Sequence, residues 1–86
     1  MEAETPRLPS QDEIDEESRR IRRLRIAVYL ALSCIAQGGM SLEEARALEE
    51  ATRAAALKLF PGKGRTFDLI YAPQFARMIR EVYRYP

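Results

Sequence analysis

A short loop past the middle of the chain carries the residues whose types and spacing come closest to a chemical site. Residues 59–66 read LFPGKGRT, so two glycines, a lysine, an arginine and a threonine occupy five consecutive positions. Glycine-rich backbone leading into a helix capped by Thr66 would present N–H groups to an anion, with positive charge from Lys63 and Arg65. The loop predicts either an anion site or a plain turn between helices, and we favour the turn.

The loop does not match a P-loop, which would hold a nucleotide. That motif reads G-x-x-x-x-G-K-[ST] between a strand and a helix, so that a hydroxyl beside the lysine holds magnesium. Here Gly64 follows Lys63, Leu57 stands five positions before Gly62, and a predicted helix precedes the loop. We therefore expect no nucleotide cofactor.

An arginine block, residues 19–25, is the second candidate site, with five arginines and no acid. Arg19, Arg22 and Arg23 could contact nucleic-acid phosphates, because arginines gain affinity by displacing counterions. However, residues 12–17 contain five acids, and no aromatic residues interleave with the arginines to stack on bases. A solvated helix face, or charges flanking a helix pair, explains the block more simply.

Catalytic and metal-binding chemistry are not expected. The chain has one cysteine and no histidine, so the usual zinc ligands and a histidine base for Cys34 are lacking. Cys34 lies in an apolar stretch, where burial would leave an unreactive thiol. Adjacent glutamates at 43–44 and 49–50 are typical of solvent-facing helix positions, and Asp68 of a first helical turn. We predict a protein that is not an enzyme and needs no metal or cofactor.

A long first helix is expected over residues 11–37. Either Ser10 or Asp12 can cap it, and Gly38 follows its end. Apolar residues recur at spacings of three, four and seven, which predicts one face directed at a core. They are Ile14, Ile21, Leu24, Val28, Ala31 and Ile35.

Two further helices are expected, over residues 41–60 and 73–84. Ser41 and Glu44 form a capping-box pattern at the start of the second, and Pro73 suits the first turn of the third. Between them, residues 66–71 predict a short helical turn, with a strand as the alternative. The inner face of the last helix is expected to contain Phe75, Met78, Ile79 and Val82, and terminal Tyr83 and Tyr85 would each bury a ring and leave the hydroxyl in water.

The sequence thus predicts a small all-α domain of three helices over residues 11–86, after a disordered tail at residues 1–10. With 86 residues, one core buries only about 60% of the surface that the unfolded chain exposes. The longest apolar run, residues 26–36, is too short to span a membrane, and the acidic start does not resemble a signal peptide. A cytoplasmic protein that does not contact membranes is expected.

Self-association is expected because the first helix is apolar on nearly every side beyond Arg25. An alanine-rich second helix is too slender to cover all of that surface. The candidate contact residues are Val28, Leu30, Leu32 and Ile35. We expect a homodimer that serves as an interaction module for a protein partner of unknown identity, with a nucleic-acid-associated regulator as the alternative function.

Overall fold

Residues 8–84, the part of the chain that this computed structural model describes, contain four helices joined by short turns. They are α1 (Gln11–Ala36), α2 (Leu42–Leu59), α3 (Gly64–Ile70) and α4 (Ala72–Tyr83), and these residues contain no strand. The all-α class predicted from the sequence is confirmed. The predicted tail at residues 1–10 falls mostly on residues 1–7, which lie outside the described residues.

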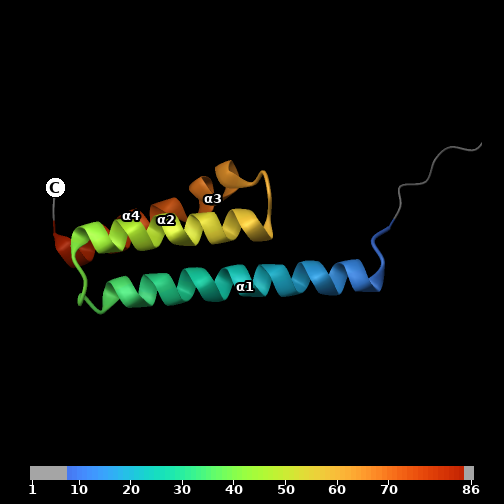
Figure 1. Cartoon of the computed structure of the whole chain (residues 1–86), viewed down its shortest axis with the longest axis horizontal. Coiled ribbons are helices and arrows are strands. Elements are labelled where there is room, and N and C mark those ends of the chain that lie inside the picture. The colour runs from blue at the N-terminus through green and yellow to red at the C-terminus, as the bar shows by residue number, and fades with distance from the viewer. Residues whose placement is uncertain (1–7, 85–86) are drawn as a thin grey trace, which may run out of the picture.

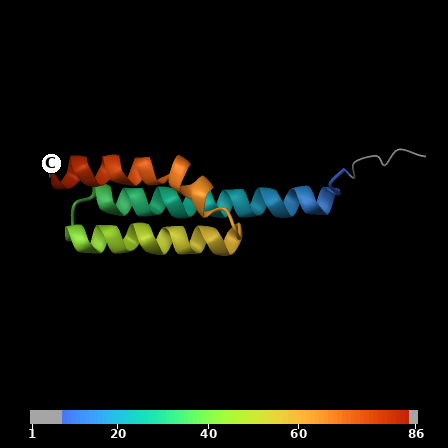
Figure 2. The same ribbon diagram turned by 90° about the horizontal axis from the view of Figure 1, so that it is seen from above.

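The three longer helices lie side by side along the long axis of the molecule (Figures 1 and 2). α1 packs against both α2 and α4, and the chain direction in Figure 1 shows that α2 runs antiparallel to α1. α3 packs on α2 and α4, whereas no Cα atom of α3 comes within 8 Å of one in α1. The short helix therefore stands away from α1 at one end of the bundle.

Local hydrogen bonds start α1 and α2 where the sequence predicts. Ser10 Oγ accepts from the Glu13 N–H at 3.2 Å, so Ser10 rather than Asp12 caps α1. Ser41 Oγ accepts from the Glu44 N–H at 3.1 Å, and Glu44 Oε1 accepts from the Ser41 N–H at 2.9 Å. This complete capping box satisfies two backbone donors that no helical carbonyl can reach.

The segment after the loop corrects the three-helix prediction. It forms a seven-residue helix, α3, that begins at Gly64, so Thr66 lies inside the helix and does not cap it. Phe67 anchors this helix, since its buried ring lies 5.4 Å from the Tyr71 ring and 6.4 Å from the Phe75 ring. One aromatic side chain thus docks α3 onto α4, and the strand alternative is wrong.

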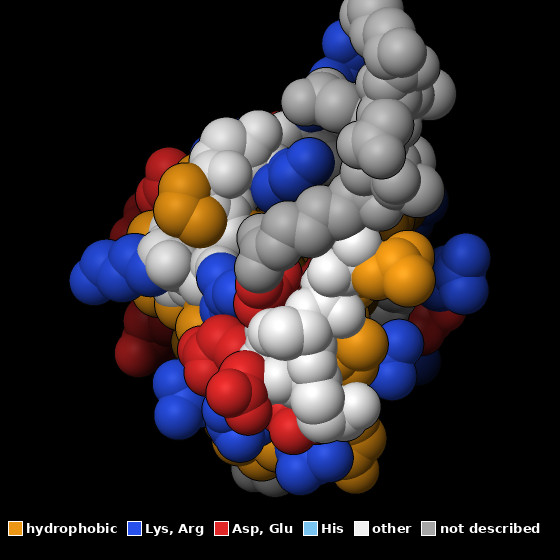
Figure 3. Space-filling model, turned by 90° about the vertical axis from the view of Figure 1, so that its right-hand side faces the viewer, with side chains coloured by type: hydrophobic (Ala, Val, Ile, Leu, Met, Phe, Trp, Pro, Cys, Tyr) orange, Lys and Arg blue, Asp and Glu red, His pale blue; other side chains and the backbone are white. Residues whose placement is uncertain are grey.

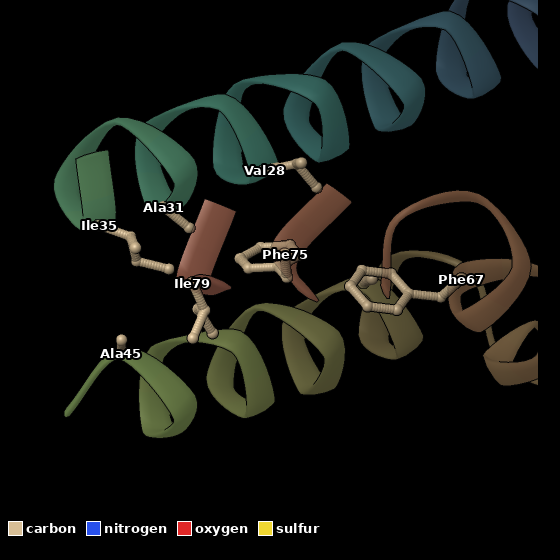
Figure 4. Close-up of a cluster of buried hydrophobic side chains, with 8 residues drawn as sticks. Val28, Ala31, Ile35, Ala45, Phe67, Phe75 and Ile79 are labelled. Carbon is tan, nitrogen blue, oxygen red and sulfur yellow. The ribbon is translucent and has the colours of Figure 1, made fainter. Parts of the chain in front are cut away.

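The core forms where the apolar faces of all four helices meet (Figure 4). The central side chains, Ile35 and Phe75, are fully buried. The small side chain of Ala45 is also fully buried, because an alanine face lets α2 approach closely. The buried apolar residues are Val28, Ala31, Ile35, Ala45, Ala56, Phe67, Phe75 and Ile79.

The N-terminal part of α1 projects beyond the bundle (Figures 1 and 2). α1 has 26 residues and α2 has 18, a difference of about 12 Å at 1.5 Å per residue. Residues 11–19 are all exposed.

Within residues 8–84, none of the helices is both long enough and apolar enough to cross a membrane.

A hydrogen bond joins the C-terminal end of α4 to the turn between α1 and α2. The Tyr83 hydroxyl donates to the Met40 carbonyl oxygen at 2.7 Å, so the prediction that this hydroxyl lies in water is wrong. The bond joins residues far apart in the chain, and no local pattern could have indicated it. Tyr85, for which the same arrangement was predicted, lies outside the described residues.

Candidate interaction site

The outer face of α1 carries large apolar side chains that the bundle leaves uncovered. Ile26, Tyr29 and Leu30 are 51%, 70% and 55% exposed. Spacings of three and four residues place them on one side of the helix, away from the side that Val28 and Ile35 direct at the core. We call Ile26, Tyr29 and Leu30 the outer stripe.

The four residues predicted for self-association are divided between the core and the surface. Val28 and Ile35 are buried within the chain's own core, and Leu32 is half-buried against it. Leu30 alone lies on the outer stripe. Ile26 and Tyr29, the other two members of the stripe, were not among these four predicted residues. Their spacing of three places two large apolar side chains on one helix face, and this was a signal that could have identified them.

The arginine block runs along α1 from its projecting part. Arg19 Nη2 lies 3.2 Å from Glu16 Oε2, and Arg20 Nε lies 3.9 Å from Glu16 Oε1, so one carboxylate serves two arginines. Arg22 and Arg23 are exposed, and neither forms an ion pair within residues 8–84. The block thus offers less unpaired positive charge than its sequence indicates.

Charges of both signs are mixed at the end of the molecule from which α1 projects. Figure 3 looks onto this end and shows Asp and Glu side chains bordered by Lys and Arg, with hydrophobic side chains among them. The ion pairs of Glu16 with Arg19 and Arg20 lie in the N-terminal half of α1. Such interspersed charge weakens the positive field that a polyanion would meet.

The loop between α2 and α3 has the properties of a turn. Gly62 has a φ of +78°, in the left-handed region that favours glycine. The Lys63 N–H donates to the Phe60 carbonyl oxygen at 3.3 Å, so it does not face a ligand. The side chains of Lys63 and Arg65 are both exposed.

A bidentate ion pair beside this loop joins α2 to α3. Arg53 Nε and Nη2 donate to Asp68 Oδ1 and Oδ2 at 2.8 and 3.0 Å. These hydrogen bonds hold the pKa of the Asp68 carboxyl below its ordinary value. A Cβ atom at Gly64 would lie 2.7 Å from Arg53 Nη2, so this glycine leaves room for the pair. Asp68 is therefore not the first-turn acid that the sequence predicted, and its partner is 15 residues away.

A cleft of about 330 Å³ lies where α3 stands away from α1. Its lining is mostly apolar and comes from α1, α2 and the region of α3, together with the polar side chain of Thr66. The apolar lining residues are Ile21, Leu24, Ala56, Leu57, Phe60, Phe67, Ile70 and Tyr71. Its charged lining residues are Arg25 from α1 and Lys63 from the loop. Lys63 therefore shares this cleft with Arg25, the last residue of the arginine block, so the structure brings together parts of two candidate sites that the sequence predicted separately. The proximity of Arg25 and Lys63 depends on how α3 packs, so it could not be predicted from the sequence.

Cys34 is exposed, which contradicts the predicted burial. It belongs to the side of α1 that no other helix covers, because the bundle packs on one face of that helix only.

Among residues 8–84, no three His, Cys, Asp or Glu side chains are grouped in a way that could hold a metal ion.

Comparisons with known proteins identify no relative of this chain. No protein-family model matches it, and neither a curated protein nor a solved structure matches it at a significant level.

Proposed function

We propose that this protein is a non-catalytic helical interaction module that self-associates through α1 and docks on a protein partner. The observation that carries the proposal is the outer stripe, where three large apolar side chains are each at least half exposed on one helix. Contiguous exposed apolar side chains with polar surroundings are typical of protein interaction surfaces. A cytoplasmic setting, expected from the sequence, is part of the same proposal.

Covering the outer stripe supplies the driving force for association. Full burial of one large aliphatic side chain contributes roughly 1.5–3 kcal/mol, and a two-fold symmetric contact buries the stripe of both copies. Ile26, Tyr29 and Leu30 would together contribute several kcal/mol per copy before the entropic cost of association is subtracted. Arg22 and Arg23 lie one turn before the stripe and would border the contact.

Sedimentation equilibrium at tens of micromolar tests the proposal. We expect the wild-type protein to sediment at about twice the chain mass and Leu30→Glu at the mass of one chain. Leu30 is 55% exposed, so the variant should retain its helical circular dichroism. Leu69→Glu is the matched control, because Leu69 is 69% exposed on α3 and lies outside the stripe.

Two results would contradict self-association through this surface. One is a stable wild-type monomer at that concentration, and the other is a Leu30→Glu dimer as tight as the wild type. Leu32→Glu is not a suitable test, because Leu32 packs against the core and its substitution would unfold the chain.

Nucleic-acid association is the second candidate function. It is supported by Arg22 and Arg23, which are exposed and have no ion pair within residues 8–84, together with exposed Lys63 and Arg65. Retention of the purified protein on immobilised DNA or RNA at low salt, lost at high salt, would support this candidate. Arg19 contributes less, because Glu16 already pairs with it. Absence of retention at low salt removes the candidate.

A further inference from the structure

We propose that the cleft between α1 and α3 is a docking site for an acidic amphipathic helix of a partner protein. The inference rests on the proposed function in one respect, that the module docks on a protein. It assigns that role to the cleft, which lies on the core-facing side of α1, whereas the outer stripe lies on the opposite side. The two surfaces can therefore be occupied at the same time.

The walls of the cleft favour an apolar occupant. α1 contributes Ile21 and Leu24, and the end of α2 contributes Phe60. The opposite wall includes Ile70, which is 51% exposed at the end of α3. The chain's own helices leave this volume of about 330 Å³ open, because α3 packs on α2 and α4 and none of its Cα atoms lies within 8 Å of one in α1. An occupant with large apolar side chains would complete the packing of these residues.

The charges of the cleft favour an acidic occupant. Arg25 and Lys63 line it, and no acidic residue does. Both are exposed, and neither forms an ion pair within residues 8–84. A partner with carboxylates beside its apolar face would pair with both cations, whereas a basic partner would meet two like charges.

The openness of the site favours a helix over a small molecule. Small-molecule sites usually enclose most of the ligand surface, whereas this cleft has a half-exposed residue, Ile70, in its wall. Leu69, next in the chain, is 69% exposed and extends the apolar surface beyond the cleft. A helix in a groove buries side chains at positions i, i+3, i+4 and i+7 while its polar face stays in water. A long-chain carboxylate is the competing occupant.

A matched pair of synthetic peptides tests this assignment. Both carry leucine at positions i, i+3, i+4 and i+7 and alanine at most other positions to favour a helix, and the few charged positions are glutamate in one and lysine in the other. Titration into Leu30→Glu, which removes the proposed self-association contact, is followed by amide NMR shifts and fluorescence anisotropy. We expect saturable binding of the glutamate peptide only, with shifts centred on Ile21, Leu24 and Ile70.

Charge variants then separate the cleft from the rest of the surface. In the Leu30→Glu background, Arg25→Glu with Lys63→Glu should weaken the glutamate peptide by about tenfold or more, because attraction becomes repulsion at both cations. Arg22→Glu with Arg65→Glu is the matched control, since it changes the net charge equally at exposed residues outside the cleft. The control should bind the peptide several-fold more tightly than the cleft variant does.

Four outcomes would overturn the proposal. They are no saturable binding of the glutamate peptide, equal binding of the lysine peptide, shifts centred outside the cleft, and equal weakening in both charge variants. Dodecanoate is titrated in parallel, and saturable dodecanoate shifts at Ile21 and Ile70 without peptide binding would assign the cleft to an amphiphile instead. These results are independent of the sedimentation experiment, so a wild-type monomer refutes self-association and leaves the cleft assignment standing.

Discussion

Removing the side chain that caps α2 tests how much one local contact contributes to the fold. Ser41→Ala deletes the oxygen that accepts from the Glu44 N–H at 3.1 Å. Glu44 Oε1 can still accept from the N–H of residue 41, as it does now at 2.9 Å, so half of the capping box remains. The expected cost is about 1 kcal/mol, because serine-to-alanine changes at N-caps cost about 0.5–2 kcal/mol.

Thermal unfolding followed by circular dichroism measures this cost. For a domain of this size, 1 kcal/mol corresponds to a decrease in Tm of about 4–8 °C. Ser41→Gly should lose only a few tenths of a kcal/mol, since glycine is tolerated at the cap. Ser18→Ala is the control, because Ser18 is exposed within α1 and caps nothing, and alanine there slightly favours the helix.

The pKa of Glu44 provides a second measurement on the same variant. Hydrogen bonds from Ser41, chiefly from its backbone N–H, lower the pKa of Glu44. In Ser41→Ala we expect this pKa to rise part of the way and to remain below the ordinary glutamate value. An unchanged Tm, or an equal loss in Ser18→Ala, would show that Ser41 does not cap α2 as described.

Three other contacts give expected outcomes. Tyr83→Phe removes the hydrogen bond to the Met40 carbonyl oxygen and should cost about 0.5–1.5 kcal/mol in urea unfolding, whereas an unchanged midpoint would show that the bond contributes nothing. Arg53→Gln should return the pKa of Asp68 to the ordinary aspartate range in an NMR titration. Because pairing lowers that pKa, its stabilisation is present above the ordinary range and is lost as pH falls through the lowered value, so the variant should lose less stability in acid. Ala45→Leu overfills a fully buried position and should cost about 1–3 kcal/mol, and equal stability would mean that α2 can move away from α1.

Much of the fold could be predicted because it depends on residues close together in the sequence. Ser10 and Ser41 start helices through bonds to residues three positions ahead, and Gly38 has the positive φ that ends one. Periodicity also identified part of the core face of α1, where Val28 and Ile35 are buried, but it wrongly included Ile14, which is 44% exposed on the projecting part of the helix. The helix starts and ends follow from a few neighbouring residues, and the core face follows from the helical repeat, so both leave a signal in the sequence.

Features that depend on how helices are placed against one another were missed. Cys34 was expected to be buried because its neighbours in sequence are apolar, but it lies on the uncovered side of α1. Asp68 was predicted to lie in the first turn of a helix. Because α3 begins earlier than predicted, at Gly64, Asp68 lies farther along the helix and pairs with Arg53. The proximity of Arg25 and Lys63 likewise depends on the position of α3. None of these placements leaves a periodic signal in the sequence.

The outer stripe is exposed because it lies opposite the face of α1 that α2 and α4 cover. Fully buried Ala45 brings the α2 backbone close to α1, so α2 and α4 enclose the core face of α1 tightly. Both helices pack on the side of Val28 and Ile35, so Ile26 and Leu30 on the opposite side of α1 stay exposed. A bulkier α2 would cover more surface but would hold α1 farther away and loosen the contacts of Ile35. The alanine face thus accounts for the tight packing on one side of α1, whereas the opposite side has no neighbour within residues 8–84 and is the surface that the proposed self-association would cover.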